Sequence, residues 1–184
     1  LLMVFLIILA AVTITRINAS NQAIGFILED RYAKVVLTQS IETEINVQAR
    51  DLRNAIILGA GEKAQIAAII DRIAESVHRT DGFMNKLKSM INTPKGEALF
   101  ESLSQARAKY GVTRTATMAL LREGKTTEAG AYLLKEVTAP QAEFSAALDA
   151  MSAFQASLME TEGAKVRADT QSAVWIAVAL TTGA

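Results

Sequence analysis

The chain contains no cysteine, a single histidine and only two prolines among its 184 residues. The lack of cysteine excludes a disulfide scaffold, thiolate metal sites, iron–sulfur clusters and a cysteine nucleophile. One histidine, His78, cannot supply the paired Glu-x-x-His motifs of a di-iron bundle, and it makes a Ser-His-Asp triad hard to assemble. We therefore expect neither an enzyme nor a protein that holds a metal or cofactor. The scarcity of proline favours helix along most of the chain.

The charges balance, with 19 basic and 19 acidic residues, so the chain lacks the electrostatic footprint of a nucleic-acid-binding protein. Its mean hydropathy of +0.23 is nevertheless high for an all-helical soluble protein. The two ends explain part of this value, because no charge precedes Arg16 and none follows Asp169. Both uncharged runs are shorter than the roughly 20 apolar residues of a membrane-spanning helix.

Because both runs reach an end of the chain, we interpret them as two incomplete membrane spans. Residues 1–17 are expected to be a truncated first transmembrane helix, and residues 172–184 the start of a second. Trp175 lies where an interfacial aromatic belt would fall. Two alternatives remain open: a signal-peptide core for the first run, and the buried end of a soluble helix for the second.

Between these runs the sequence predicts four helices separated by short loops. The first continues from the apolar run to about Leu58, before the glycines at 59 and 61, and the third ends before Gly124. Thr93-Pro94 is typical of a capped helix start. The second helix carries an unbroken heptad seam, with apolar or small residues alternating at spacings of four and three: Ile66, Ile70, Ile73, Val77, Thr80, Met84, Leu87 and Ile91.

Four such helices predict an all-α fold, an up-down-up-down antiparallel four-helix bundle over residues 18–171. In this topology the first and last helices leave the bundle at the same end. Their long apolar continuations into the membrane spans would therefore mount the bundle on a membrane. Pro140 is expected to kink the last helix locally.

The third helix carries the candidate binding residues. Arg107, Tyr110 and Arg114 share one face, and no acid occurs anywhere between Ser102 and Arg122. Neither arginine has a carboxylate three or four residues away, so the usual pairing within one helix is absent. An acid on a neighbouring helix remains the alternative explanation.

A rise of about 1.5 Å per residue places other polar and aromatic residues near the same level of the bundle. The candidate ligand-binding set is Arg107, Tyr110, Arg114, Thr80, Ser76, Arg53, Gln141 and Phe144. Guanidinium groups bind carboxylates bidentately, so the set predicts a site for a small di- or tricarboxylate. The alternative for the threonines is that they are ordinary small residues of the core. The pattern leaves open whether the site lies within one bundle or between two protomers.

Several stretches of the chain resemble the four-helix-bundle ligand-binding domain of bacterial methyl-accepting chemotaxis receptors. They are Thr15–Ala19, Asp30–Tyr32, Leu120–Lys125, and Asp149–Met151 with Gln155. The resemblance covers essentially the whole chain. It implies a dimeric periplasmic sensor on the inner membrane, although higher oligomers remain open. Such a sensor would bind a small organic acid such as citrate or malate and signal by a small shift of its last helix.

Similar modules occur on histidine kinases and cyclic-dinucleotide enzymes, so the resemblance does not define the output of the receptor. A second alternative is a structural, membrane-tethered bundle that binds a protein partner and no small molecule. The arginines of the third helix distinguish these functions, because a purely structural bundle has no reason to leave them without acids.

Overall fold

The computed structural model describes residues 2–182, which lie in helices or in three short connections, with no strand among them. Two π-helical segments interrupt the first and last helical stretches. The elements are α1 (Leu2–Phe26), η1 (Ile27–Tyr32), α2 (Ala33–Leu58), α3 (Lys63–Met90), α4 (Pro94–Arg122), α5 (Thr126–Tyr132), η2 (Leu133–Val137) and α6 (Thr138–Thr182).

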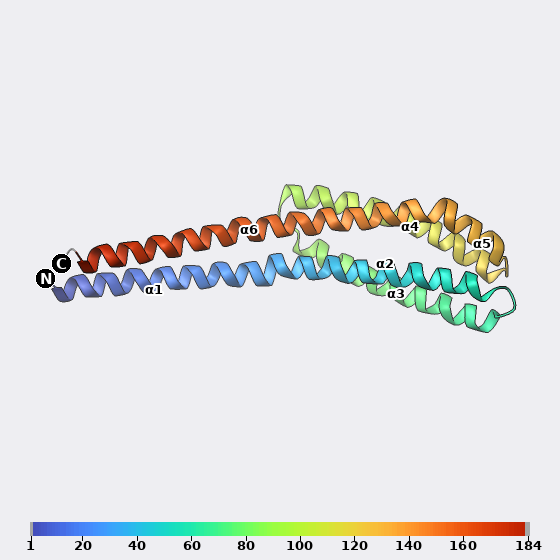
Figure 1. The fold of residues 1–184 in the computed structure, drawn as a ribbon, viewed down its shortest axis with the longest axis horizontal. Coiled ribbons are helices and arrows are strands. Elements are labelled where there is room, and N and C mark those ends of the chain that lie inside the picture. The colour runs from blue at the N-terminus through green and yellow to red at the C-terminus, as the bar shows by residue number, and fades with distance from the viewer. Residues whose placement is uncertain (1, 183–184) are drawn as a thin grey trace. The chain divides into compact units, whose positions relative to one another are not determined.

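Because η1 joins α1 to α2 without a break, and η2 joins α5 to α6, these elements form four continuous helical stretches (Figure 1). They correspond to the four helices that the heptad spacing predicts. The all-helical four-helix fold is therefore confirmed.

The described residues form two compact units. The bundle unit is Lys34–Phe154; the terminal unit holds the described residues up to Ala33 together with those from Gln155 onwards. Within residues 2–182, no helix is both long enough and apolar enough to span a membrane. The boundaries at residues 17 and 172 stay predictions, and positions 1, 183 and 184 of the expected spans lie outside the described residues.

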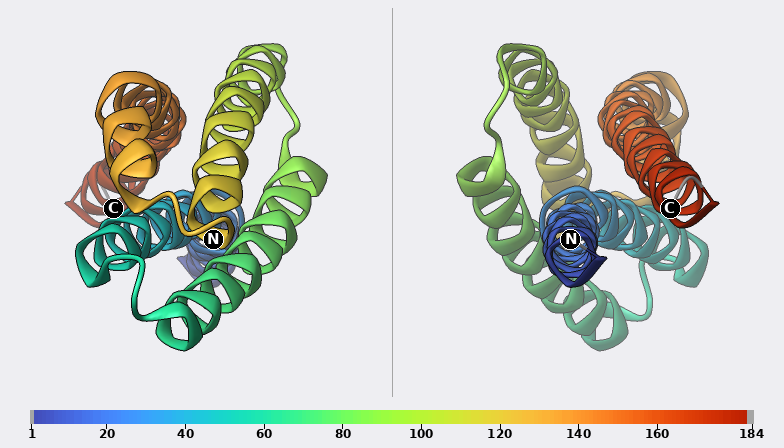
Figure 2. Two further views of the ribbon diagram at one scale, coloured as in Figure 1. Left: turned by 90° about the vertical axis from the view of Figure 1, so that its right-hand side faces the viewer. Right: turned by 90° about the vertical axis from the view of Figure 1, so that its left-hand side faces the viewer.

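Short connections link successive helices of the bundle unit, as the two end-on views of Figure 2 show. Gly59 and Gly124 both have φ of +76°, a left-handed conformation that glycine adopts without steric cost. The Thr93 side chain accepts a hydrogen bond of 3.1 Å from the Gly96 backbone N–H, and Pro94 opens α4. The predicted ends of the first and third helices and the predicted start of α4 are thus confirmed.

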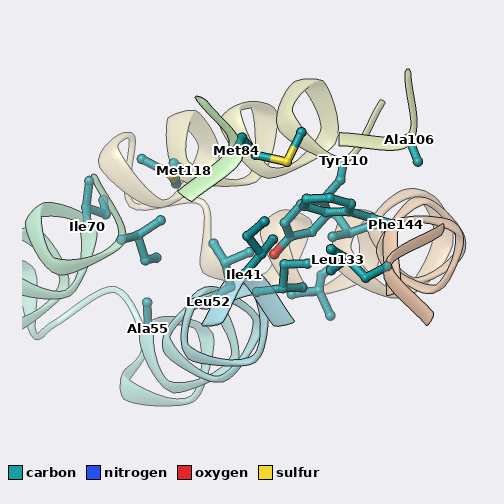
Figure 3. Packing of buried hydrophobic residues seen from close by; sticks show 14 of the residues in the cluster. Ile41, Leu52, Ala55, Ile70, Met84, Ala106, Tyr110, Met118, Leu133 and Phe144 are labelled. Atoms are coloured by element: carbon teal, nitrogen blue, oxygen red, sulfur yellow. The ribbon is translucent and has the colours of Figure 1, made fainter. Parts of the chain in front are cut away.

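The predicted heptad seams form the core of the bundle unit. Most seam positions of α3 are buried, and with the buried Leu103, Tyr110 and Met118 of α4 they pack against α2 and against α6 (Figure 3). Ile41, Ile45 and Leu52 of α2 are fully buried, as are Phe144 and Leu148 of α6. The core also contains polar side chains, which bear directly on the candidate site.

A buried arginine dominates the polar contacts of the terminal unit. The Arg31 guanidinium contacts Glu162 through its Nη2, 3.0 Å from Oε1, and Asp30 through its Nη1, 2.9 Å from Oδ2. It also lies 4.8 Å from the centre of the Phe26 ring. This cation is therefore held by two carboxylates and an aromatic face.

Candidate ligand-binding site

Three helices of the bundle unit contribute a connected set of polar side chains. Arg114 Nη1 of α4 donates to Gln48 Oε1 of α2 at 2.9 Å. Gln48 Nε2 in turn donates to two residues of α3, Ser76 Oγ at 3.1 Å and Thr80 Oγ1 at 3.2 Å. We call Gln48, Ser76, Thr80, Tyr110 and Arg114 the polar layer; of these, only Arg114 is not fully buried.

The direction of each hydrogen bond in the polar layer is fixed by chemistry. Arg114 can only donate, so the Gln48 oxygen must face it and the amide nitrogen must face the hydroxyls. Ser76 Oγ then donates to the Glu44 carbonyl at 3.2 Å, and Thr80 Oγ1 donates to the Ser76 carbonyl at 2.9 Å. Gln48 thus uses both of its amide protons and its oxygen inside the bundle.

Tyr110 and the neighbouring Arg114 each have a polar atom without a hydrogen-bond partner among the described residues. The Tyr110 hydroxyl and the Arg114 Nε are both buried and make no hydrogen bond. Figure 3 shows the Tyr110 hydroxyl directed into the core cluster. A buried polar group without a partner costs about 1–3 kcal/mol, so native structures rarely keep two together unless water or a ligand satisfies them.

The aromatic rings complete the arrangement around Tyr110. The Phe144 ring centre lies 6.1 Å from that of Tyr110, and the Arg114 guanidinium carbon lies 5.5 Å from the Tyr110 ring centre. Burial raises the pKa of Tyr110 to about 12, although the positive charges of Arg114 and Arg53 partly offset this effect. Tyr110 is therefore a neutral hydrogen-bond donor at ordinary pH.

The two arginines of the predicted site differ in their partners. Burial lowers the pKa of both Arg107 and Arg114, because it disfavours the charged form. Arg107 forms an ion pair with Asp81 of α3. Arg114 contacts no carboxylate within the described residues, and its hydrogen-bond partner is a neutral amide.

For Arg107 the alternative of an acid on a neighbouring helix therefore holds, because Asp81 of α3 pairs with it, whereas Arg114 has no such carboxylate within the described residues. Asp81 lies on a different helix, so spacing along one helix cannot reveal the pair. Arg53 is exposed, but its charge is close enough to offset part of the rise that burial causes in the pKa of Tyr110. Gln141 is half-buried and makes no hydrogen bond to the polar layer in the described part of the chain.

Sequence reasoning missed Gln48. Ile41, Ile45, Gln48, Leu52 and Ala55 follow the same alternation of four and three, and all five are buried. A glutamine in such a seam must find partners inside the bundle, because an unpaired buried amide is costly. The seam of the first helix therefore carried a detectable signal.

The fold and the polar layer define an all-helical bundle module with a polar section in its core. A comparison with protein families matches residues 1–170 to the four helix bundle sensory module for signal transduction. Since this match covers most of the sequence, the chain belongs to that family. A comparison with curated proteins gives no match.

Proposed function

We propose that the chain is the sensor domain of a membrane chemoreceptor and binds a small di- or tricarboxylate, such as citrate or malate, at the polar layer. The observation that carries the proposal is the half-buried charge of Arg114, which no carboxylate of the described chain neutralises, together with the unpartnered hydroxyl of Tyr110, whose ring the guanidinium contacts. A buried charge is stable only when it is paired, and a bound anion would provide the pair.

The chemistry of the layer suits a carboxylate. A guanidinium presents a planar fork of N–H donors that matches two carboxylate oxygens, and a neutral phenol adds a further donor. Arg107 and Arg53 contribute positive charge nearby: besides burial, the charge of Arg107 lowers the pKa of Arg114, and that of Arg53 offsets part of the rise that burial causes in the pKa of Tyr110. A ligand with two or three carboxylates would gain more from this field than one with a single carboxylate.

The family supports a role in sensing rather than in catalysis, because its members are sensory modules for signal transduction. We therefore propose binding without chemistry, a periplasmic position on the inner membrane, and signalling as a homodimer. The ligand would bias one packing of the last helix over another, by an amount equal to its differential affinity for the two states.

A thermal-shift screen of the 184-residue chain tests the proposal. Organic acids are compared with neutral polyols of similar size at constant ionic strength. A ligand at 100 times its dissociation constant adds about 2.7 kcal/mol to the free energy of unfolding. For a chain of this size that corresponds to a rise in Tm of roughly 5–10 °C.

Two arginine variants locate the site. Arg114→Ala is expected to abolish the shift, while Arg122→Ala, which removes an exposed arginine from the end of the same helix, leaves it intact. If no organic acid raises Tm, the carboxylate proposal is wrong, and a sensory module that responds to a protein partner becomes the better hypothesis. If Arg114→Ala retains the full shift, the site lies elsewhere.

A further inference from the structure

Gln48 occupies a position on Arg114 that a carboxylate oxygen would also take. Its Oε1 lies 2.9 Å from Arg114 Nη1, which is within the range of a charge-assisted hydrogen bond. The amide of a glutamine and the carboxylate of a glutamate have the same planar shape, and their oxygen acceptors lie at the same distance from Cα. They differ in that the amide carries no net charge.

We propose that Gln48 is an internal stand-in for the ligand: it holds Arg114 while the site is empty, and a ligand carboxylate displaces it. This inference rests on the proposed function and adds the competitor that sets the affinity of the site. A carboxylate outcompetes the amide because an ionic acceptor binds a guanidinium more strongly than a neutral one.

The exchange would change contacts between helices. In the empty state Gln48 connects α2 to α4 through Arg114 and to α3 through Ser76 and Thr80. When the ligand takes Arg114, the bond between α2 and α4 is lost, while both bonds between α2 and α3 can remain. Ligand binding would thus weaken the connection between α2 and α4.

Variants at position 48 separate a competitor from a residue that helps to bind. Gln48→Ala removes the competing oxygen and is expected to lower the Kd of the organic acid about three- to tenfold. Gln48→Glu supplies a permanent carboxylate beside Arg114 and is expected to abolish the thermal response to the acid. Gln39→Ala, an exposed glutamine on the same helix, is the matched control and is expected to keep the wild-type Kd.

Titration calorimetry with the acid identified in the screen provides the readout, and circular dichroism establishes that each variant is folded. If Gln48→Glu fails to fold, Gln48→Met takes its place; it keeps the length of the side chain, lacks the amide oxygen and is expected to bind like Gln48→Ala. Weaker binding by Gln48→Ala or Gln48→Met, or wild-type binding by Gln48→Glu, would overturn the proposal.

The outcome also distinguishes this inference from the proposed function. When neither the wild type nor Gln48→Ala responds to any acid, the proposed function fails. When the wild type responds and Gln48→Ala binds no more tightly, the sensor function stands and only the stand-in role of Gln48 is wrong.

Discussion

Arg31 in the terminal unit and Arg114 in the bundle unit are two inward-facing arginines in similar settings. Each guanidinium lies near an aromatic ring, Phe26 for Arg31 and Tyr110 for Arg114. Arg31 contacts two carboxylates, whereas Arg114 contacts one amide and leaves its Nε without a partner. Carboxylates thus lie beside Arg31, whereas within the described residues none lies beside Arg114 of the polar layer.

Other arginines of the bundle unit show that acids are available there. Arg79 binds Glu44 through two nitrogens, at 2.7 and 2.9 Å, and Arg72 Nε lies 3.1 Å from an oxygen of the buried Asp51. The lack of an acid beside Arg114 is therefore a local property. The predictions below test whether it reflects function or only packing, starting from the largest expected effect.

Replacing Arg31 with an apolar side chain of similar length should strongly destabilise the protein. Arg31→Met removes the guanidinium that contacts the Asp30 and Glu162 carboxylates, which are 18% and 29% exposed. Removing one partner of a buried pair costs about 3 kcal/mol. Urea unfolding followed by circular dichroism measures this loss, and an unchanged midpoint would show that the pair does not stabilise the fold.

Ionisation of Tyr110 should destabilise the protein at high pH. An unfolded tyrosine ionises near pH 10, whereas the folded pKa is about 12. The unfolded state therefore releases its proton first, and this contribution to stability, present in full below pH 10, is lost as the pH rises from 10 to 12. It amounts to about 2–3 kcal/mol.

Tyr110→Phe isolates this contribution from the other groups that titrate at high pH. The free energy of unfolding, measured with urea between pH 9 and 12, should fall less steeply in Tyr110→Phe than in the wild type. Equal slopes would mean that the folded and unfolded pKa values of Tyr110 do not differ.

At neutral pH the same variant should be more stable than the wild type. Tyr110→Phe keeps the ring that contacts Phe144 and removes a buried hydroxyl without a partner. The free energy of unfolding should rise by about 1 kcal/mol, while the thermal response to the organic acid becomes weaker. A loss of stability would instead indicate that the hydroxyl is satisfied in solution.

Arg114→Met should have the smallest effect on stability. It removes a charge that has no ionic partner, and it leaves only the Gln48 oxygen without its donor. The Gln48 oxygen left without its donor costs about 1–3 kcal/mol, but removal of a desolvated charge that has no ionic partner offsets most of this cost, so we expect a net change within about 1 kcal/mol. Denaturant unfolding beside Arg31→Met gives the direct comparison, and equal losses in the two variants would remove the contrast between the two units.

Much of the fold can be predicted from the sequence, because it depends on patterns within single helices. The alternation of four and three along residues 66–91 identifies the buried side of α3, and positive φ at Gly59 and Gly124 follows from helix ends that glycine favours. Such features depend only on neighbours a few residues away along the chain.

The candidate site is harder to predict, because it depends on contacts between helices. Tyr110 is predicted from the spacing along its own helix, and Ser76 and Thr80 from a count of residues that places them at the level of α4. Asp81 pairs with Arg107 through the relative rotation of α3 and α4, which such a count does not give. For Gln48, the seam of the first helix predicts that the amide is buried, but its partners lie on two other helices and cannot be predicted from that seam.

The π-helical segment η2 has a consequence for how the last helical stretch tolerates changes in length. Each residue of an α-helix advances the direction of its side chain by about 100°, so deleting one residue normally turns every following side chain away from the core. A π-helical turn is an α-helix that contains one extra residue. Loss of a residue within Leu133–Val137 can therefore convert η2 to an ordinary α-helical turn, after which Phe144 and Leu148 still face inward. The last helical stretch can therefore lose one residue within η2 while the same side chains of α6 continue to face the core.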